Sequence, residues 1–305
     1  MNRDTVIRRA SRASALLIVA ATAAACASGG GGGGGQITLP GPAPRTAAGF
    51  AGFDTSIYPG DNVMRAWRET SPYTWVGYYL PAPCHRDASW SGKRETLVGM
   101  GWGTAVIYLG QQDWAAMPNR TPAQDTTARA DTTIAQPQQP AAAVAPPACS
   151  STLLSASRGI TEAADAVAKT AAEGFPPGTV IWLDVERVTT VSPLLTDYVR
   201  GWVEGVLAEG RYTPGIYVHR LNADAVAAAA RAAYGTRGRS GGPPFWVTSS
   251  TGFSLDLPPT ASGLPYANVW QGPLDVRETW SGHTLQIDAN VADSRSPSAP
   301  RATTP

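Results

Sequence analysis

The sequence predicts an α/β fold in which eight strands form a (β/α)8-type, TIM-like barrel that is modified at its last two strands. From residue 49 onward, short apolar runs alternate with helical stretches, and helices follow most of the first six strands. Strands separated by helices form right-handed βαβ units in a parallel sheet, and eight such strands suggest a closed barrel. The alternative is an open, doubly wound sheet. No Gly-x-Gly-x-x-Gly motif follows the first strand, so a dinucleotide site is not supported, and we expect no cofactor and no metal site.

The hydrophobic periodicity places each element along the chain. Strands are predicted at residues 51–56, 74–80, 104–110, 179–186, 214–219, 245–250, 268–272 and 284–291. Helices are predicted at residues 61–70, 92–100, 154–173, 193–210 and 222–234. We expect Asp61 to cap the first helix, and Pro193 suits the first turn of the fourth. A short glycine-containing link joins the last two strands in place of a helix, which favours a hairpin there.

Residues 1–25 are predicted to be a signal peptide. Arg8, Arg9 and Arg12 form its basic part, and the apolar stretch that follows is too short to span a bilayer. Three alanines then precede Cys26, a pattern that resembles a lipobox and predicts lipidation of Cys26. Ordinary cleavage after an Ala-x-Ala site is the alternative. The arginine pair also leaves a twin-arginine export signal open.

Composition divides the rest of the chain. Residues 26–48 are predicted to be a lipid-anchored Gly/Pro-rich tether, residues 49–293 the barrel, and residues 294–305 a disordered tail. Residues 111–149 are rich in Ala, Pro, Gln and Thr, which predicts a low-complexity, largely disordered insertion. If Cys26 carries lipid, Cys84 and Cys149 remain, and an oxidising compartment favours a disulfide between them over two separate thiols.

Charge and aromatic content limit the partners. The formal net charge of the whole chain is +1, which provides no basic field suited to nucleic acid. We expect contact with a membrane only through the lipid anchor, and a monomer. Ten tryptophans suit a carbohydrate site, because an aromatic face packs on a sugar, although most of them are expected in the core.

Acidic residues recur at the predicted strand ends. Alternate residues of a strand share a face, so Trp182, Asp184 and Glu186 point into the barrel, with the acids at the carboxyl-end rim where barrel enzymes place their sites. Asp54 and Asp288 are expected at the same rim. Polar side chains of the fifth and seventh strands join them, namely Tyr217, His219 and Gln271. The alternative is a set of rim acids that bind loop amides and fix the top of the barrel.

Such a cluster suits hydrolysis of a glycosidic bond. One carboxyl must stay protonated to protonate the leaving oxygen, and another must stay ionised to stabilise an oxocarbenium-like transition state, attack the sugar or activate water. Residues two apart in a strand are about 6.6 Å apart along the chain, near the boundary between retaining and inverting separations. The stereochemical outcome therefore stays open.

Five short motifs occur in the order seen in family 25 glycoside hydrolases, the muramidase-type lysozymes. They are Gly-Phe-Asp-Thr-Ser at 52–56 with Tyr58, Asp-Val-Glu at 184–186, Gly-Ile-Tyr at 215–217, Trp-Gln at 270–271 and Ile-Asp-Ala-Asn at 287–290. The sequence resembles still more closely the bacterial glycoside-hydrolase-like domain called domain of unknown function 1906. Residues 71–79, Cys84 and residues 101–110 carry that closer resemblance, which covers roughly residues 49–293.

The resemblance implies a role for each acid. Glu186 would be the general acid, Asp184 and Asp288 would stabilise the charged sugar or position its N-acetyl group or water, and Asp54 would lie at the floor. Depth in the pocket favours Asp184 as the protonated partner, but reach toward the leaving oxygen favours Glu186.

Five further residues are expected to contact the substrate, namely Tyr79, Trp182, Tyr217, His219 and Gln271. The predicted function is that of an exported glycosidase acting on peptidoglycan or another cell-envelope glycan. The alternative is a non-catalytic glycan-binding envelope lipoprotein that uses the same cleft.

Overall fold

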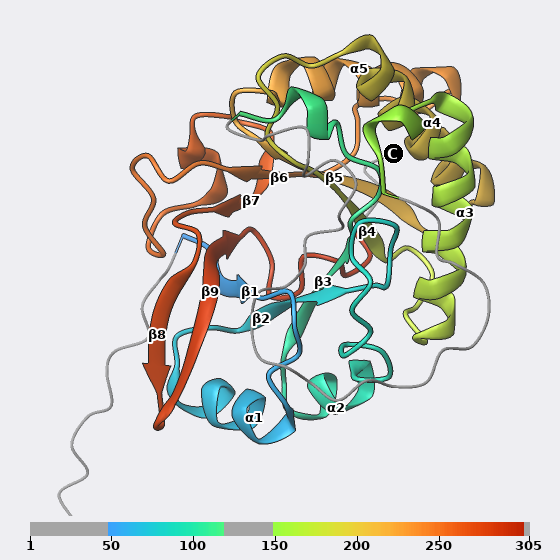
Figure 1. Cartoon of the computed structure of the whole chain (residues 1–305). Helices are drawn as coiled ribbons and strands as arrows, with labels where there is room; N and C mark the ends of the chain where they lie inside the picture. The colour runs from blue at the N-terminus through green and yellow to red at the C-terminus, as the bar shows by residue number, and fades with distance from the viewer. Residues whose placement is uncertain (1–47, 119–148, 302–305) are drawn as a thin grey trace, which may run out of the picture. The chain divides into compact units, whose positions relative to one another are not determined.

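The computed structural model describes residues 48–118 and 149–301 of the chain. The predicted signal peptide, Cys26 and the tether up to residue 47 lie outside the described residues, as do residues 119–148 of the insertion. The strands form one sheet in the order β1-β2-β3-β4-β5-β6-β7-β9-β8, and β1 also pairs with β9. This pairing closes a barrel of eight strands, with helices around its outside (Figure 1). The predicted TIM-like α/β fold is confirmed.

The strands that form the barrel are short. They are β1 (Phe50–Asp54), β2 (Trp75–Tyr79), β3 (Gly103–Tyr108), β4 (Val180–Val185), β5 (Thr213–His219), β6 (Phe245–Thr248), β7 (Ala267–Gln271) and β9 (His283–Ala292). Neighbours from β1 to β7 are parallel. Their carboxyl ends therefore meet at one end of the barrel, as the positions of the acids require.

The last part of the sheet differs from the prediction. An additional strand, β8 (Val276–Trp280), lies outside the barrel and pairs with the first half of β9. The hairpin is formed by β8 and β9, with Ser281 and Gly282 at positive φ in its turn. The last two barrel strands, β7 and β9, do pair antiparallel as a hairpin requires, but the predicted short link between them is wrong, because it contains β8. Because no helix returns the chain after β7, β9 runs antiparallel to both β7 and β1.

The helices are α1 (Asp61–Thr70), α2 (Arg94–Gly99), α3 (Ala156–Ala172), α4 (Pro193–Glu209) and α5 (Ala223–Thr236). Pro193 begins α4 as predicted, and the Ser192 hydroxyl caps the helix by accepting a hydrogen bond from the Leu195 amide. The prediction for Asp61 is wrong. Gly60 occupies the cap position, and Asp61 lies in the first turn, where its carboxylate accepts from the Tyr58 hydroxyl and the Lys93 ammonium.

Alternate residues of β4 face two separate apolar layers. Ile181 and Leu183 belong to the layer between the strands and the outer helices. Trp182 belongs to a smaller cluster whose buried members all come from strands. In this cluster Trp246 makes edge-to-face contacts with Trp182 (ring centroids 5.9 Å apart) and with Trp75 (5.6 Å). Nine of the ten tryptophans are buried, so they mainly form the core.

Residues 294–301 pack against the barrel, so the predicted disordered tail is wrong for this stretch, and residues 302–305 lie outside the described residues. The Val180 amide donates to the Ser298 carbonyl (2.9 Å), and the Ser298 amide donates to the Thr104 carbonyl (3.0 Å). The Ser298 hydroxyl also accepts from the Val106 amide (2.7 Å). The tail therefore bridges β3 and β4 by hydrogen bonds at their amino ends, where the two strands do not yet pair directly, because their ladder begins at Val106. Such small polar residues carry no burial signal, because backbone groups supply the contact.

None of the helices in the described ranges combines the length and the apolarity that crossing a membrane requires.

Candidate active site

The four predicted acids lie at the same end of the barrel. Asp54 ends β1, Asp184 is the penultimate residue of β4, and Glu186 follows β4 directly. Asp288 also lies at this end, but its position in its strand differs from the expected one. It lies in the middle of the antiparallel strand β9, and its register with β1 places it opposite Asp54. The expectation that Asp288 belongs to the carboxyl-end part of its strand is therefore wrong, because β9 runs in the reverse direction.

Asp54 forms the floor of the site and is only 3% exposed. One carboxylate oxygen accepts from the Tyr79 hydroxyl (2.7 Å), and the other accepts from the amides of Gln271 (2.9 Å) and Asn290 (2.8 Å). Burial raises the pKa of Asp54, the three donors oppose that rise, and the charge of Glu186 adds to it. Gly77 makes room for this carboxyl, because a Cβ there would lie 2.6 Å from the Asp54 Cβ.

A second set of donors fixes the two amides that bind Asp54. The Tyr217 hydroxyl donates to Gln271 Oε1 (2.6 Å), and Trp246 Nε1 donates to Asn290 Oδ1 (3.0 Å). Each amide oxygen is thereby occupied, so each NH2 group must point at Asp54. Asn290 was not among the predicted site residues. Its signal in the sequence is its position two residues after Asp288, on the same face of the strand.

Tyr79 and Tyr217 lie within the electrostatic reach of the acids. Burial raises the pKa of the Tyr217 phenol well above its ordinary value, and the charges of Glu186, Asp184, Asp54 and Asp288 raise it further. Burial likewise raises the pKa of Tyr79, with further contributions from the charges of Asp54, Asp184 and Asp288. Both phenols therefore stay neutral hydrogen-bond donors among the carboxyl groups of the site.

The half-buried residues Asp184 and Glu186 are held by Gln112, which was not predicted. The side-chain amide of Gln112 donates to the Asp184 carbonyl (2.7 Å) and accepts from the Glu186 amide (3.0 Å). Residues 111–149 were expected to be disordered, and this is wrong for residues 111–118. Gln111, Gln112 and Asp113 are buried, and residues Trp114–Ala116 form a 3-10 turn. The sequence signal that could have identified Gln112 as a site residue is its position shortly after the end of β3.

The remaining residues predicted for the site differ in their hydrogen bonds and in their burial. Asp288 accepts from the Asp275 amide (2.7 Å), a contact of the kind expected for a rim acid that fixes a loop. His219 ends β5 half-buried, and its Nδ1 accepts from the Leu221 amide (3.2 Å), which assigns its proton to Nε2. Burial lowers the pKa of His219, and the charge of Arg187 lowers it further. The role of Trp182 in binding substrate stays a prediction that its full burial does not favour.

The predicted disulfide between Cys84 and Cys149 is confirmed. It packs with Trp114 in a small buried cluster that ties the loop after β2 to the segment that leads into α3. Within the described ranges, no group of His, Cys, Asp and Glu side chains is arranged to hold a metal ion.

An eight-stranded barrel with carboxyl groups gathered at one rim is the architecture of a glycoside-hydrolase type of domain. A family model agrees, since the Rv2525c-like, glycoside hydrolase-like domain matches residues 65–292. The chain therefore belongs to this family, and the predicted glycoside-hydrolase-like identity is confirmed.

The solved structures that the chain matches have low sequence identity to it and TM-scores below 0.5. An uncharacterised Bacillus stearothermophilus protein is 19% identical, with a TM-score of 0.48 over 81% of this chain and 97% of that one. The Tat-secreted protein Rv2525c of Mycobacterium tuberculosis is 16% identical, with a TM-score of 0.46 over 81% and 96%. GHIP, a glycosyl hydrolase 25 of Streptococcus pneumoniae, is 12% identical, with a TM-score of 0.45 over 81% and 88%. A comparison with curated proteins finds no match.

Proposed function

We propose that the protein is an exported glycoside hydrolase that cleaves peptidoglycan or another cell-envelope glycan by carboxylate acid/base chemistry. The observation that carries the proposal is that Asp54, Asp184, Glu186 and Asp288 lie at the same end of the barrel, with Asp288 opposite Asp54. Hydrolysis of a glycosidic bond needs one protonated and one ionised carboxyl group in the same pocket. Membership of the glycoside hydrolase-like family supports the same reaction class.

Glu186 is the general acid in this proposal. It lies just beyond β4 and is half-buried, so its long side chain combines partial desolvation with access to a leaving oxygen. Asp184 and Asp288 stabilise positive charge on the sugar or position its N-acetyl group or a water molecule. Asp54 is too buried to contact substrate, and it acts as an anion beneath them.

Neutral polar groups complete the pocket. Tyr79, Tyr217 and Gln271 form the hydrogen-bonded layer around Asp54, and the half-buried His219 offers its Nε2 proton at the rim. The phenol protons of Tyr79 and Tyr217 are used within this layer, so these phenol oxygens can accept from glycan hydroxyl groups, whereas the Nε2 proton of His219 can be donated to a glycan oxygen.

Incubation of the full-length mature chain with purified peptidoglycan tests the proposal, with mass spectrometry of the released sugars. We expect soluble saccharides from the wild type, and a loss on the order of 10³-fold for Glu186→Gln with glycan binding and thermal stability nearly intact. Hydrolysis by Glu186→Gln at the wild-type rate would contradict the role of Glu186. If the wild type releases nothing, but both Glu186→Gln and Asp184→Asn lose glycan affinity, the protein is a glycan-binding module instead.

Export and anchoring are proposed from the sequence alone. Cys26 follows three alanines and an apolar run, so Cys26→Ser should abolish acylation and release the protein from membranes or leave an uncleaved precursor. Fractionation and mass measurement of the processed N-terminus decide between these results. Normal acylation of the variant would exclude Cys26 as the anchor.

A further inference from the structure

We infer that Gln112 is a positioning residue that sets the geometry of Asp184 and Glu186, an inference that rests on the proposed function for its kinetic consequence. Its side-chain amide binds the carbonyl of Asp184 and the amide of Glu186, one on each side of Val185. Gln112 is 1% exposed, so water does not compete for these bonds.

The position of this contact explains why it is needed. The ladder between β3 and β4 ends where Tyr108 pairs with Leu183, one residue before Asp184. On the other side, β5 continues to pair as far as Val185. Asp184 and Glu186 therefore lie beyond the end of the β3 ladder, and the side chain of Gln112 contacts the backbone of both residues there.

The amide of Gln112 takes the place of a missing strand residue. In a parallel ladder, one residue of a strand donates to the carbonyl before its partner and accepts from the amide after it. Gln112 makes the same two bonds to the residues that flank Val185. The backbone that carries both acids is thus held from two sides, although β3 has already ended.

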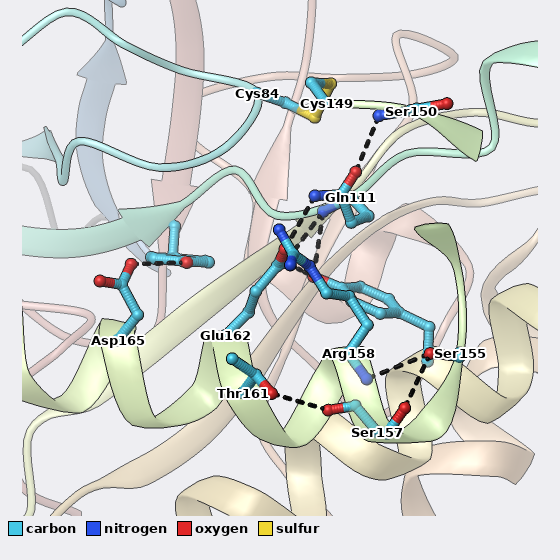
Figure 2. A network of polar contacts seen from close by, with 12 residues as sticks. Cys84, Gln111, Cys149, Ser150, Ser155, Ser157, Arg158, Thr161, Glu162 and Asp165 are labelled. Carbon is cyan, nitrogen blue, oxygen red and sulfur yellow. Dashed lines mark hydrogen bonds and ion pairs between the residues drawn. A yellow bond between two sulfur atoms is a disulfide. The ribbon is translucent and has the colours of Figure 1, made fainter. Parts of the chain in front are cut away.

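The residue before Gln112 in the chain, Gln111, belongs to a network of polar contacts with α3 and Ser150 (Figure 2). The Gln111 backbone amide donates to the Tyr198 hydroxyl (3.0 Å) and to Glu162, and its side chain donates to Glu162 (2.8 Å). Its side-chain oxygen accepts from the Ser150 amide (2.8 Å), next to the disulfide at Cys149. The loop that carries Gln112 is therefore anchored to α3 and α4.

Asn222 provides a matched control. Its side-chain amide also makes two bonds to one stretch of backbone, accepting from the Val188 amide (3.1 Å) and donating to the Val188 carbonyl (2.9 Å). It is buried like Gln112 and acts on the same loop, but two residues beyond Glu186. Gln112→Met and Asn222→Leu each remove two such bonds with little change in side-chain size.

The kinetic test compares the two variants on peptidoglycan. We expect Gln112→Met to lower kcat on the order of 100-fold with KM nearly unchanged, because the carboxyl groups are misplaced while the glycan contacts remain. We expect Asn222→Leu to keep kcat within a few-fold of wild type at similar thermal stability. Equal losses of kcat in the two variants would reduce Gln112 to a structural residue and overturn the inference.

A third variant adds a pH-dependent readout. In Gln112→Glu the introduced carboxylate can still accept from the Glu186 amide, but it opposes the Asp184 carbonyl unless it is protonated. The kcat of this variant relative to wild type should therefore rise as the pH falls. A ratio that is constant across pH would contradict the donor role of Gln112.

Amide hydrogen exchange separates this inference from the proposed function. If the wild type hydrolyses no glycan, the proposed function fails, but the Glu186 amide should still exchange about tenfold or more faster in Gln112→Met than in wild type and Asn222→Leu. Unchanged exchange at Glu186 would overturn the positioning role whether or not the protein is an enzyme.

Discussion

Asp54 and Glu162 are both buried carboxylates, with 3% and 2% of their surfaces exposed, yet their partners differ in charge. Glu162 on α3 accepts from Arg158 (2.6 Å), from Tyr198 and from Gln111. Asp54 at the barrel floor is held by three neutral groups. The charge of Glu162 is balanced by a cation, which suits an anchor, whereas the charge of Asp54 acts on the pocket above it.

The two regions also differ in how their donors are arranged. Arg158, Tyr198 and Gln111 each point an N–H or O–H group at Glu162, and among them only Tyr198 has a hydroxyl that can turn to accept. Asp54 faces the hydroxyl of Tyr79 on one oxygen and two amides on the other. An uncharged amide can therefore replace Asp54 if only the Tyr79 hydroxyl turns from donor to acceptor, whereas at Glu162 a new NH2 group would face N–H groups that cannot turn. Three changes, taken in order of their effect on the free energy of unfolding, test this contrast.

Removal of the disulfide should have the largest effect, because the bridge holds the loop beside Glu162. Cys84 and Cys149 are 65 residues apart, so we expect the Cys84→Ser, Cys149→Ser variant to lose about 4 kcal/mol of unfolding free energy by the chain-entropy model. Chemical denaturation measures this loss. A wild type whose unreduced, unfolded chain reacts with alkylating reagent at both positions would contradict the bridge itself.

Glu162→Gln should destabilise the protein by about 2–3 kcal/mol, because the new NH2 group must face a donor and Arg158 loses its charged partner. The Arg158 side chain is 25% exposed, so water replaces part of the lost interaction and keeps the effect below that of a fully buried pair. Denaturant unfolding at neutral pH measures it. If Glu162→Gln is as stable as wild type, the contrast between the two carboxylates fails.

Asp54→Asn should have the smallest effect and the opposite sign. The pKa of Asp54 is raised from 3.8, so its contribution to stability is fully present below that value and is lost as the pH rises through the folded-state pKa. The variant should therefore be slightly more stable than wild type at pH 7, and the difference should vanish at acidic pH.

Thermal unfolding of Asp54→Asn and wild type between acidic and neutral pH checks this trend. The stability gain should come with reduced hydrolysis, since the anion beneath the pocket is gone. If the stability of Asp54→Asn falls with rising pH in parallel with that of wild type, Asp54 is not the group whose ionisation causes the pH dependence of stability.

Local patterns in the sequence determined much of the barrel and part of the site. The switch between periods of two and 3.6 residues identified every barrel strand and the five helices to within a few residues. Alternation within β4 placed Asp184 and Glu186 on the face of Trp182, because side-chain direction in a strand depends only on parity. The cysteine count, together with the predicted export, indicated the pairing of Cys84 with Cys149.

Only the tertiary structure decided how distant segments meet. The reversed direction of β9 brings Asp288 opposite Asp54, and strand direction depends on which edge a segment joins rather than on its composition. Gln112 and Ser298 each supply hydrogen bonds where the ladder between β3 and β4 is missing. Neither residue lies in an apolar pattern that a sequence search could detect. Each is needed because it supplies a donor and an acceptor where two strands are not paired, and that position is defined only by the closed barrel.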